Sequence, residues 1–194
     1  METWTDYVET IAGCLRAMTA TDRSGAALPV GDAISAWVAM THATAERGGQ
    51  MYIIGNGGSA GMASHMAADA CKNGHLRAIA FNDPVMLTAT ANDLAYDQVF
   101  SLPLQRLARP GDLVVAISSS GNSPNIVRAL ETSRELALQS ITLTGMRADN
   151  RARTLGTLNF YVDVPRYGWA ESAHQIILHH WLDEYLSGHR GGAI

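Results

Sequence analysis

The sequence predicts an α/β protein built on a parallel β-sheet with helices on both faces. From Met51 onward, short apolar runs alternate with longer segments that have helical spacing. The run 113–117 is continuously apolar, which is typical of a strand buried on both faces. With 194 residues, 47% hydrophobic and 16% charged, we expect one domain over 1–194. Within it, residues 1–48 should form N-terminal helices and residues 49–194 the α/β core.

Composition excludes several classes of function. The net charge is −4 and Lys72 is the sole lysine, which argues against nucleic-acid binding. Cys14 and Cys71 have no paired spacing, so a reducing compartment is expected. No run approaches the roughly 18 apolar residues of a membrane span, and the N-terminus lacks a signal-peptide pattern. We therefore expect a cytoplasmic protein with no membrane or nucleic-acid partner.

Two helices are expected before the first strand. Apolar residues spaced three and four apart predict one helix over 3–20. A break over 24–31 precedes a second helix over 32–47. Both helices precede the first predicted strand, so no neighbouring strand in the sequence offers them a sheet to cover. Each could fold over the edge of the core or pack against another copy of the chain. The second arrangement is the one we expect.

The core segments follow a regular alternation. Strands are expected at 51–54, 78–81, 113–117, 140–143 and 158–164. Helices are expected over 60–73, 82–93, 96–107, 124–138 and 170–186. Pro103 should bend the third of these helices. Strands separated by crossover helices indicate a parallel sheet.

The first strand runs into a glycine-rich turn, Gly55 to Ser59. Glycines permit positive φ and a close approach of the backbone to a ligand, and the amides at a helix start suit an anion. The turn lacks the Gly-Lys-Ser/Thr of a Walker loop and the last glycine of a dinucleotide fingerprint. Alone, it is equally compatible with an ordinary βα turn. On the following helix, His65 and Asp69 are four residues apart and share one face.

A second loop is more specific for phosphate. Residues 118–122 are three serines, a glycine and an asparagine, and Ser123 and Pro124 follow at the start of the next helix. Capping that helix needs only one serine. Clustered hydroxyls with backbone amides can surround a phosphate without a lysine, so this loop predicts a phosphate site.

The two loop motifs, Gly-Asn-Gly-Gly-Ser and Ser-Ser-Ser-Gly-Asn-Ser-Pro-Asn, with Asn92-Asp93 between them, resemble the sugar isomerase (SIS) fold family and within it the phosphoheptose isomerases. The resemblance implies a five-stranded parallel, flavodoxin-like sheet with two N-terminal helices for oligomerisation. It also implies a homotetramer with active sites at subunit boundaries and a bound Zn²⁺ or other divalent metal. The implied reaction is the aldose–ketose interconversion of sedoheptulose 7-phosphate and D-glycero-D-manno-heptose 7-phosphate, through an enediol.

The same resemblance implies roles for individual residues. Asn56 and Asp93 would line the sugar. The phosphate would be held by Gly57, Gly58, Ser59, Ser118, Ser119, Ser120 and Ser123. The metal would be held by His65, Asp69, Glu171 and His179. Asp69 and His179 would also shuttle the proton.

Two of the implied ligands depart from the family pattern. Asp69 replaces a glutamate and is about one methylene shorter, and Glu171 stands where many members have glutamine. Glu171 and His179 are eight residues apart, about 12 Å along a helix. Either the last helix begins just after Glu171, or one ligand comes from a neighbouring chain. His174 could contact a metal ligand without binding the metal itself. His180 is the alternative to His179 as a ligand.

The remaining histidines, His42, His75 and His189, lack partners at metal spacing and are expected at the surface. Two other functions stay open at this point. One is isomerisation of another long-chain ketose phosphate, such as an octulose phosphate. The other is a non-catalytic SIS protein that binds a sugar phosphate or a protein. The presence of both His65 and His179 favours an enzyme.

Overall fold

The computed structural model describes residues 3–188, which fold around a seven-stranded sheet of order β2-β1-β7-β6-β5-β3-β4. Its parallel part consists of β3 (Met51–Gly55), β4 (Ala78–Ala80), β5 (Leu113–Ser118), β6 (Gln139–Gly145) and β7 (Leu158–Val162). Their order, β4-β3-β5-β6-β7, is that of flavodoxin-like sheets. The predicted parallel core is therefore confirmed.

An antiparallel hairpin extends this core. Strand β1 (Thr19–Asp22) pairs antiparallel with β7, and β2 (Ala27–Leu28) pairs with β1. The prediction of helix through residue 20 is wrong here, and the predicted break over 24–31 contains the short strand β2. Helix α1 (Trp4–Arg16) ends at Arg16, and the β-branched residues that follow pair with the open edge of β7. The hairpin thereby covers an edge that would otherwise expose unpaired backbone groups.

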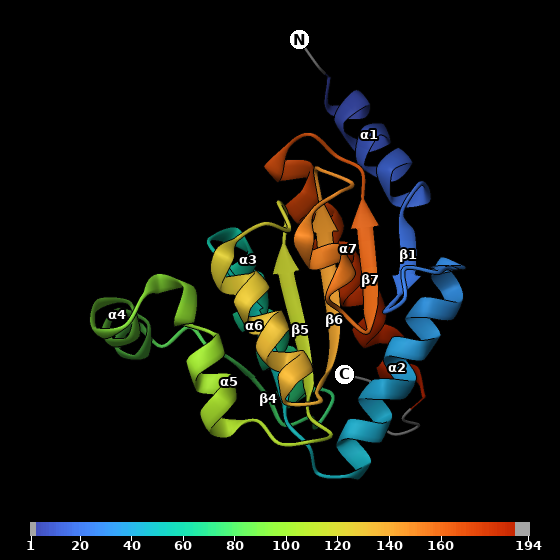
Figure 1. Cartoon of the computed structure of the whole chain (residues 1–194). Coiled ribbons are helices and arrows are strands. Elements are labelled where there is room, and N and C mark those ends of the chain that lie inside the picture. Colours follow the sequence, from blue (N-terminus) through green and yellow to red (C-terminus); the bar gives the residue numbers. More distant parts are fainter. Residues whose placement is uncertain (1–2, 189–194) are drawn as a thin grey trace.

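Helices cover both faces of the sheet. The remaining helices are α2 (Val30–Glu46), α3 (Gly58–Lys72), α4 (Pro84–Asp93), α5 (Ser101–Leu107), α6 (Pro124–Glu135) and α7 (Tyr167–Ser187), with 3-10 turns η1 (Tyr96–Gln98) and η2 (Arg151–Thr154). Helices α2, α3 and α7 pack on one face and α5 and α6 on the other. Figure 1 shows α6 in front of the sheet, α3 and α7 behind it, and α4 beyond the edge. None of the described helices is both long and apolar enough to cross a bilayer.

The strands supply apolar side chains to both layers because successive residues point to opposite faces. In β3, Met51 and Ile53 join the core under α2, α3 and α7, whereas Tyr52 and Ile54 join the core under α5 and α6. All five residues of β3 are buried. This two-sided burial explains why the central strands read as continuous apolar runs.

The two N-terminal helices pack differently from each other. On α2, Trp37 is fully buried and stacks on Trp181 of α7, with ring centroids 4.7 Å apart. The apolar side of α2 around Trp37 therefore packs within the chain against α7, and packing of the N-terminal helices against another copy stays a prediction. Helix α1 has no buried residue, and Trp4 and Val8 are 78% and 42% exposed.

Two helix boundaries differ from the sequence expectation. Pro103 lies in the first turn of α5, where a backbone N–H has no helical partner, so the proline starts a separate helix instead of bending a long one. Helix α7 begins at Tyr167, three residues before the expected start at Ala170. Gly168 therefore lies inside the first helical turn.

Candidate functional site

The carboxyl ends of β3 and β5 are neighbours at the centre of the sheet, where Gly55 pairs with Ile117. From this point β4 lies to one side and β6 to the other. Such a switch point leaves a crevice at which parallel α/β sheets bind ligands. The loops that follow the two strands are Gly55 to Ser59, here called the glycine loop, and Ser118 to Ser123, the serine loop.

The two loops and the start of α7 enclose one cavity of about 240 Å³. Its walls are Asn56, Gly57, Gly58, Ser59, Ile117, Ser118, Ser119, Ser120, Ser123, Tyr167 and Glu171. The structure thus brings together all the positions assigned to phosphate by the resemblance. No arginine or lysine is among these lining residues, so hydroxyl groups and backbone amides dominate the described part of the pocket.

Among the hydroxyl groups of the pocket, those of Ser119 and Ser123 make no hydrogen bond within the described part of the chain. Ser119 is 5% exposed, and its Oγ is buried without a partner among the described residues. Ser123 is the N-cap residue of α6, yet its side chain makes no capping hydrogen bond. A buried hydroxyl without a partner is unusual because it costs desolvation energy. Both groups are available to a ligand in the cavity.

Glycine is required at one turn of each loop. Gly57, the N-cap residue of α3, has φ 55° and ψ −123°, a conformation that other residues rarely adopt. Gly121 has φ 62°, and a Cβ there would lie 2.0 Å from Asn150 Oδ1. The serine loop can therefore approach the β6–β7 connection closely only because residue 121 has no side chain.

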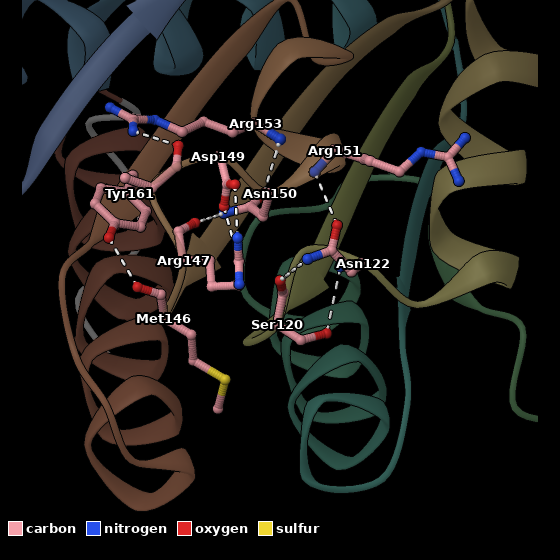
Figure 2. A network of polar contacts seen from close by, with 10 residues as sticks. Ser120, Asn122, Met146, Arg147, Asp149, Asn150, Arg151, Arg153 and Tyr161 are labelled. Carbon is pink, nitrogen blue, oxygen red and sulfur yellow. Dashed lines mark hydrogen bonds and ion pairs between the residues drawn. The ribbon is translucent and has the colours of Figure 1, made fainter.

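The connection between β6 and β7 holds the serine loop in place (Figure 2). The backbone N–H of Arg151 donates to Asn122 Oδ1 at 3.0 Å, and that of Ala152 donates to the Gly121 carbonyl at 2.9 Å. Asn122 Nδ2 in turn donates to the Ser120 carbonyl at 3.2 Å. The loop is consequently fixed by backbone and Asn122 bonds, together with the Ser120 hydroxyl, which accepts from the Asn122 N–H at 3.3 Å.

The arginines of this connection are engaged locally instead of lining the cavity. Arg147 forms a two-pronged ion pair with Asp149, at 2.7 and 2.9 Å. Arg151 pairs with a carboxylate of α6, and the guanidinium of Arg153 lies 4.3 Å from the ring centre of Tyr161. Figure 2 shows these side chains spread along the connection. All three side chains are therefore engaged outside the cavity.

Glu171 lies at the pocket and not beside His179. A Cβ on Gly58 would lie 2.7 Å from Glu171 Oε2, so the carboxylate sits directly against the glycine loop. Because α7 starts at Tyr167, Glu171 and His179 belong to one continuous helix and are about 12 Å apart along it. The possibility that the helix begins after Glu171 is excluded. A single ion bound by both positions would take one of them from another subunit.

A pair of histidines and a carboxylate lie together on the outer side of α3 and α7. His65 Nε2 is 3.4 Å from Asp69 Oδ2, and the side chains are 53% and 24% exposed, which leaves both open to a ligand. The ring centres of His65 and His179 are 5.5 Å apart. Two of the implied metal ligands thus come from different helices and meet within one chain.

Imidazole and carboxylate donors are those that zinc prefers. His65, Asp69 and His179 therefore suit a divalent metal in the type of their donor atoms. However, no group of three or more His, Cys, Asp or Glu side chains within residues 3–188 has the arrangement of a metal site. The single chain supplies suitable donors in an incomplete set.

The other histidines do not join this group. His174 is fully buried, and neither ring nitrogen has a hydrogen-bond partner among the described residues. Burial lowers the pKa of His174 to about 4, with only a partial offset from the backbone at Thr144, so the ring is neutral. His180 and His75 are exposed, whereas His42 is half-buried against Tyr185, which corrects its surface assignment. His189 lies outside the described residues.

Asp93, expected to line the sugar, is absent from the cavity wall, whereas two residues without an assigned role lie in the wall or contact it. Asp93 is exposed at the end of α4, and its Oδ1 accepts a hydrogen bond from Asn92. Tyr167 lines the cavity, and Asn125 contacts the cavity residue Asn56 through two hydrogen bonds. The position of Asn125 directly after Ser-Pro in the serine motif was the available signal.

Comparisons with known proteins agree with this architecture. The family model described as SIS domain matches residues 6–145. A phosphoheptose isomerase of Mycobacterium tuberculosis is 35% identical over 186 residues, which cover 89% of this chain and 87% of that protein. A phosphoheptose isomerase of Chlorobaculum parvum is 43% identical over 122 residues, but that match covers only 59% of this chain and 58% of the relative.

Solved structures give the same picture. The phosphoheptose isomerase of Neisseria gonorrhoeae superposes with a TM-score of 0.73 at 32% identity, over 79% of this chain and 86% of that one. The phosphoheptose isomerase of Francisella tularensis superposes with a TM-score of 0.81 at 23% identity, over 95% of this chain and 96% of that one. The second match supports the fold.

Proposed function

The chain belongs to the SIS domain family, and from this premise we propose that it is a phosphoheptose isomerase. It interconverts sedoheptulose 7-phosphate and D-glycero-D-manno-heptose 7-phosphate, as the names of its relatives and the chemistry of its pocket suggest. The observation that carries most weight is the cavity at the switch point, with the buried and unpartnered hydroxyl of Ser119. That hydroxyl fits a phosphate oxygen.

The phosphate end of the substrate fills the cavity. Ser118, Ser119, Ser120 and Ser123 donate hydroxyl hydrogen bonds, and the glycine loop adds backbone amides at the start of α3. His65 lies six residues beyond Ser59, about 9 Å further along α3. An extended sugar phosphate spans such a distance, so anchoring the phosphate orients the reacting carbons.

Proton transfer is assigned to Asp69 and His179. The isomerisation moves a proton between C1 and C2 and needs a base at carbon and an acid at oxygen. Asp69 removes the proton from one of these carbons and returns it to the other, and His179 moves a proton between the two sugar oxygens. Retention of both groups next to His65 supports an enzyme over a module that only binds.

A divalent metal, Zn²⁺ or a similar ion, is proposed as the cofactor. His65, Asp69 and His179 would hold it, together with Glu171 of a neighbouring subunit. When bound, such an ion supplies electrophilic polarisation of the sugar oxygens. The donor types in this chain support the assignment, and the incomplete donor set within residues 3–188 fits a site completed by another copy.

We further propose a homotetramer that works in the cytoplasm. The apolar side of α1 supports assembly, since Trp4 and Val8 are exposed on the described chain. Light scattering coupled to size exclusion measures the mass of the particle directly. A monomeric particle would contradict the assembly.

The deciding experiment incubates the metal-loaded protein with sedoheptulose 7-phosphate and follows formation of the aldose, with and without a chelator. Turnover that stops on chelation and returns with added Zn²⁺ is the expected result. No turnover under metal-loaded conditions would remove the proposed function. Turnover that survives complete chelation would remove the metal and leave the isomerase.

A further inference from the structure

Two amide side chains join the glycine loop to the start of α6. Asn56 Nδ2 donates to Asn125 Oδ1 at 2.9 Å, and Asn125 Nδ2 donates to Asn56 Oδ1 at 2.9 Å. Asn56 directly follows β3, and Asn125 lies in the first turn of α6. The two bonds therefore bridge the switch point, across the two loops that build the cavity.

The backbone fixes the orientation of this pair. The N–H of Ile126 donates to Asn125 Oδ1 at 2.9 Å. A backbone N–H can only donate, so Asn125 must turn its oxygen toward Ile126, and Asn56 must then turn its NH₂ group toward the same oxygen. The Tyr96 hydroxyl, 3.4 Å from Asn56 Oδ1, supports that oxygen position.

This orientation leaves one N–H of Asn56 unused. Asn56 Nδ2 carries two hydrogens, and among the described residues only Asn125 accepts from it. Asn56 lines the cavity, whereas Asn125 is 2% exposed and is not among the lining residues. A ligand in the cavity can thus reach Asn56 but not Asn125.

We propose that Asn125 is a positioning residue that acts through Asn56. Its buried amide holds the Asn56 side chain so that the second N–H donates to an oxygen of the phosphorylated ligand. A buried amide is costly unless its bonds are made, and here both bonds to Asn56 are made. The inference rests on the proposed sugar-phosphate pocket, and it does not depend on which isomerisation follows.

A double-mutant cycle tests the coupling. Affinity for sedoheptulose 7-phosphate and for inorganic phosphate is measured by calorimetry, alongside KM and kcat, for N56A, N125A and the double variant. Loss of one hydrogen bond to the ligand predicts about tenfold weaker binding in N125A, with kcat changed much less. In the N56A background, N125A should add nothing, because the group it positions is gone. Additive losses would overturn the proposal.

A second variant separates positioning from helix capping. Asn125→Ser keeps a hydroxyl that can accept from the Ile126 amide but is too short to bridge to Asn56, so it should fold and still bind about as weakly as N125A. Wild-type affinity in this variant would reduce Asn125 to a local cap and overturn the proposal. Asn159→Ala is the matched control, since Asn159 is equally buried and hydrogen-bonded but lies away from the cavity. It should lower stability without changing KM.

The result also separates this inference from the proposed function. A wild-type protein that binds sedoheptulose 7-phosphate without converting it would end the isomerase assignment, while the binding cycle would still decide the role of Asn125. Conversely, normal turnover with additive binding losses would end the positioning role alone. Coupling seen with the sugar phosphate but not with inorganic phosphate would place the Asn56 donor at a sugar hydroxyl and keep the proposal.

Discussion

Ser119 and Ser140 form a natural comparison at the scale of single residues. Both are buried, and both hydroxyls lack a hydrogen-bond partner among the described residues, but only Ser119 lines the cavity. We expect Ser119→Ala to weaken inhibition by inorganic phosphate about tenfold, since one ligand hydrogen bond is lost. Ser140→Ala should leave inhibition unchanged. Equal effects of the two variants would show that the loss acts through the fold and not through the pocket.

His179 and His180 are adjacent on α7 but face different surroundings. His179 lies against His65, whereas His180 is exposed. His179→Ala should lower kcat by about 10²- to 10⁴-fold, the usual contribution of a general acid or base. Its thermal unfolding, followed by circular dichroism, should match that of the wild type. His180→Ala should keep full activity. Unchanged kinetics in His179→Ala would exclude His179 as the acid.

At the scale of elements, glycine-to-alanine substitutions in the serine loop and in helix α3 should change stability in opposite directions. Gly121→Ala places a Cβ against Asn150 at a positive φ, so we expect about 1–3 kcal/mol lower stability and weaker phosphate binding. Gly61→Ala meets no atom within 4 Å inside α3 and should raise stability by about 0.5–1 kcal/mol. Denaturant titration measures both changes. A Gly121→Ala variant with normal phosphate affinity would show that the loop tolerates displacement.

The elements that could be predicted from the sequence are those whose signal is local. The buried strands are continuous apolar runs, and clusters of glycines and serines mark the glycine loop and the serine loop as possible ligand sites. Strands β1 and β2 could not be found in this way, because their four and two residues pair only once the edge of β7 exists. The start of α7 was placed too late because Gly168 resembles a loop residue. Tertiary packing overrides such local signals.

The candidate site also divides into residues that local motifs predict and residues that only tertiary packing brings together. The cavity positions from Gly57 to Ser59 and along the serine loop lie in two short motifs after predicted parallel strands, so the strand pattern could place both loops at one edge of the sheet, while the family resemblance assigned the individual residues. Glu171 reaches this cavity through the approach of α7, and Asn125 contacts Asn56 through the approach of α6; neither contact follows from spacing along the sequence. Asp93 shows the converse, since its motif resemblance did not bring it to the cavity wall.

For the whole molecule, His174 links stability to pH. Its pKa is near 4 in the fold and about 6.5 when unfolded, so the unfolded chain takes up the proton first as the pH falls. Stability is full above about pH 6.5 and is lost progressively toward pH 4, at up to about 1.4 kcal/mol per pH unit. Denaturant titrations from pH 7 to pH 4.5 should show this slope. His174→Leu should flatten it, and an unchanged slope would assign acid sensitivity to other groups.

Helix α7 carries Glu171 at the anion pocket and His179 at the histidine pair on one unbroken rod. In the proposed function, a displacement of this helix at Glu171 would also move His179, the proposed acid, relative to the sugar oxygens. We therefore expect substrate binding and catalytic rate to be coupled through α7. Repacking the buried face of the rod, for example around Trp181, should alter KM and kcat together.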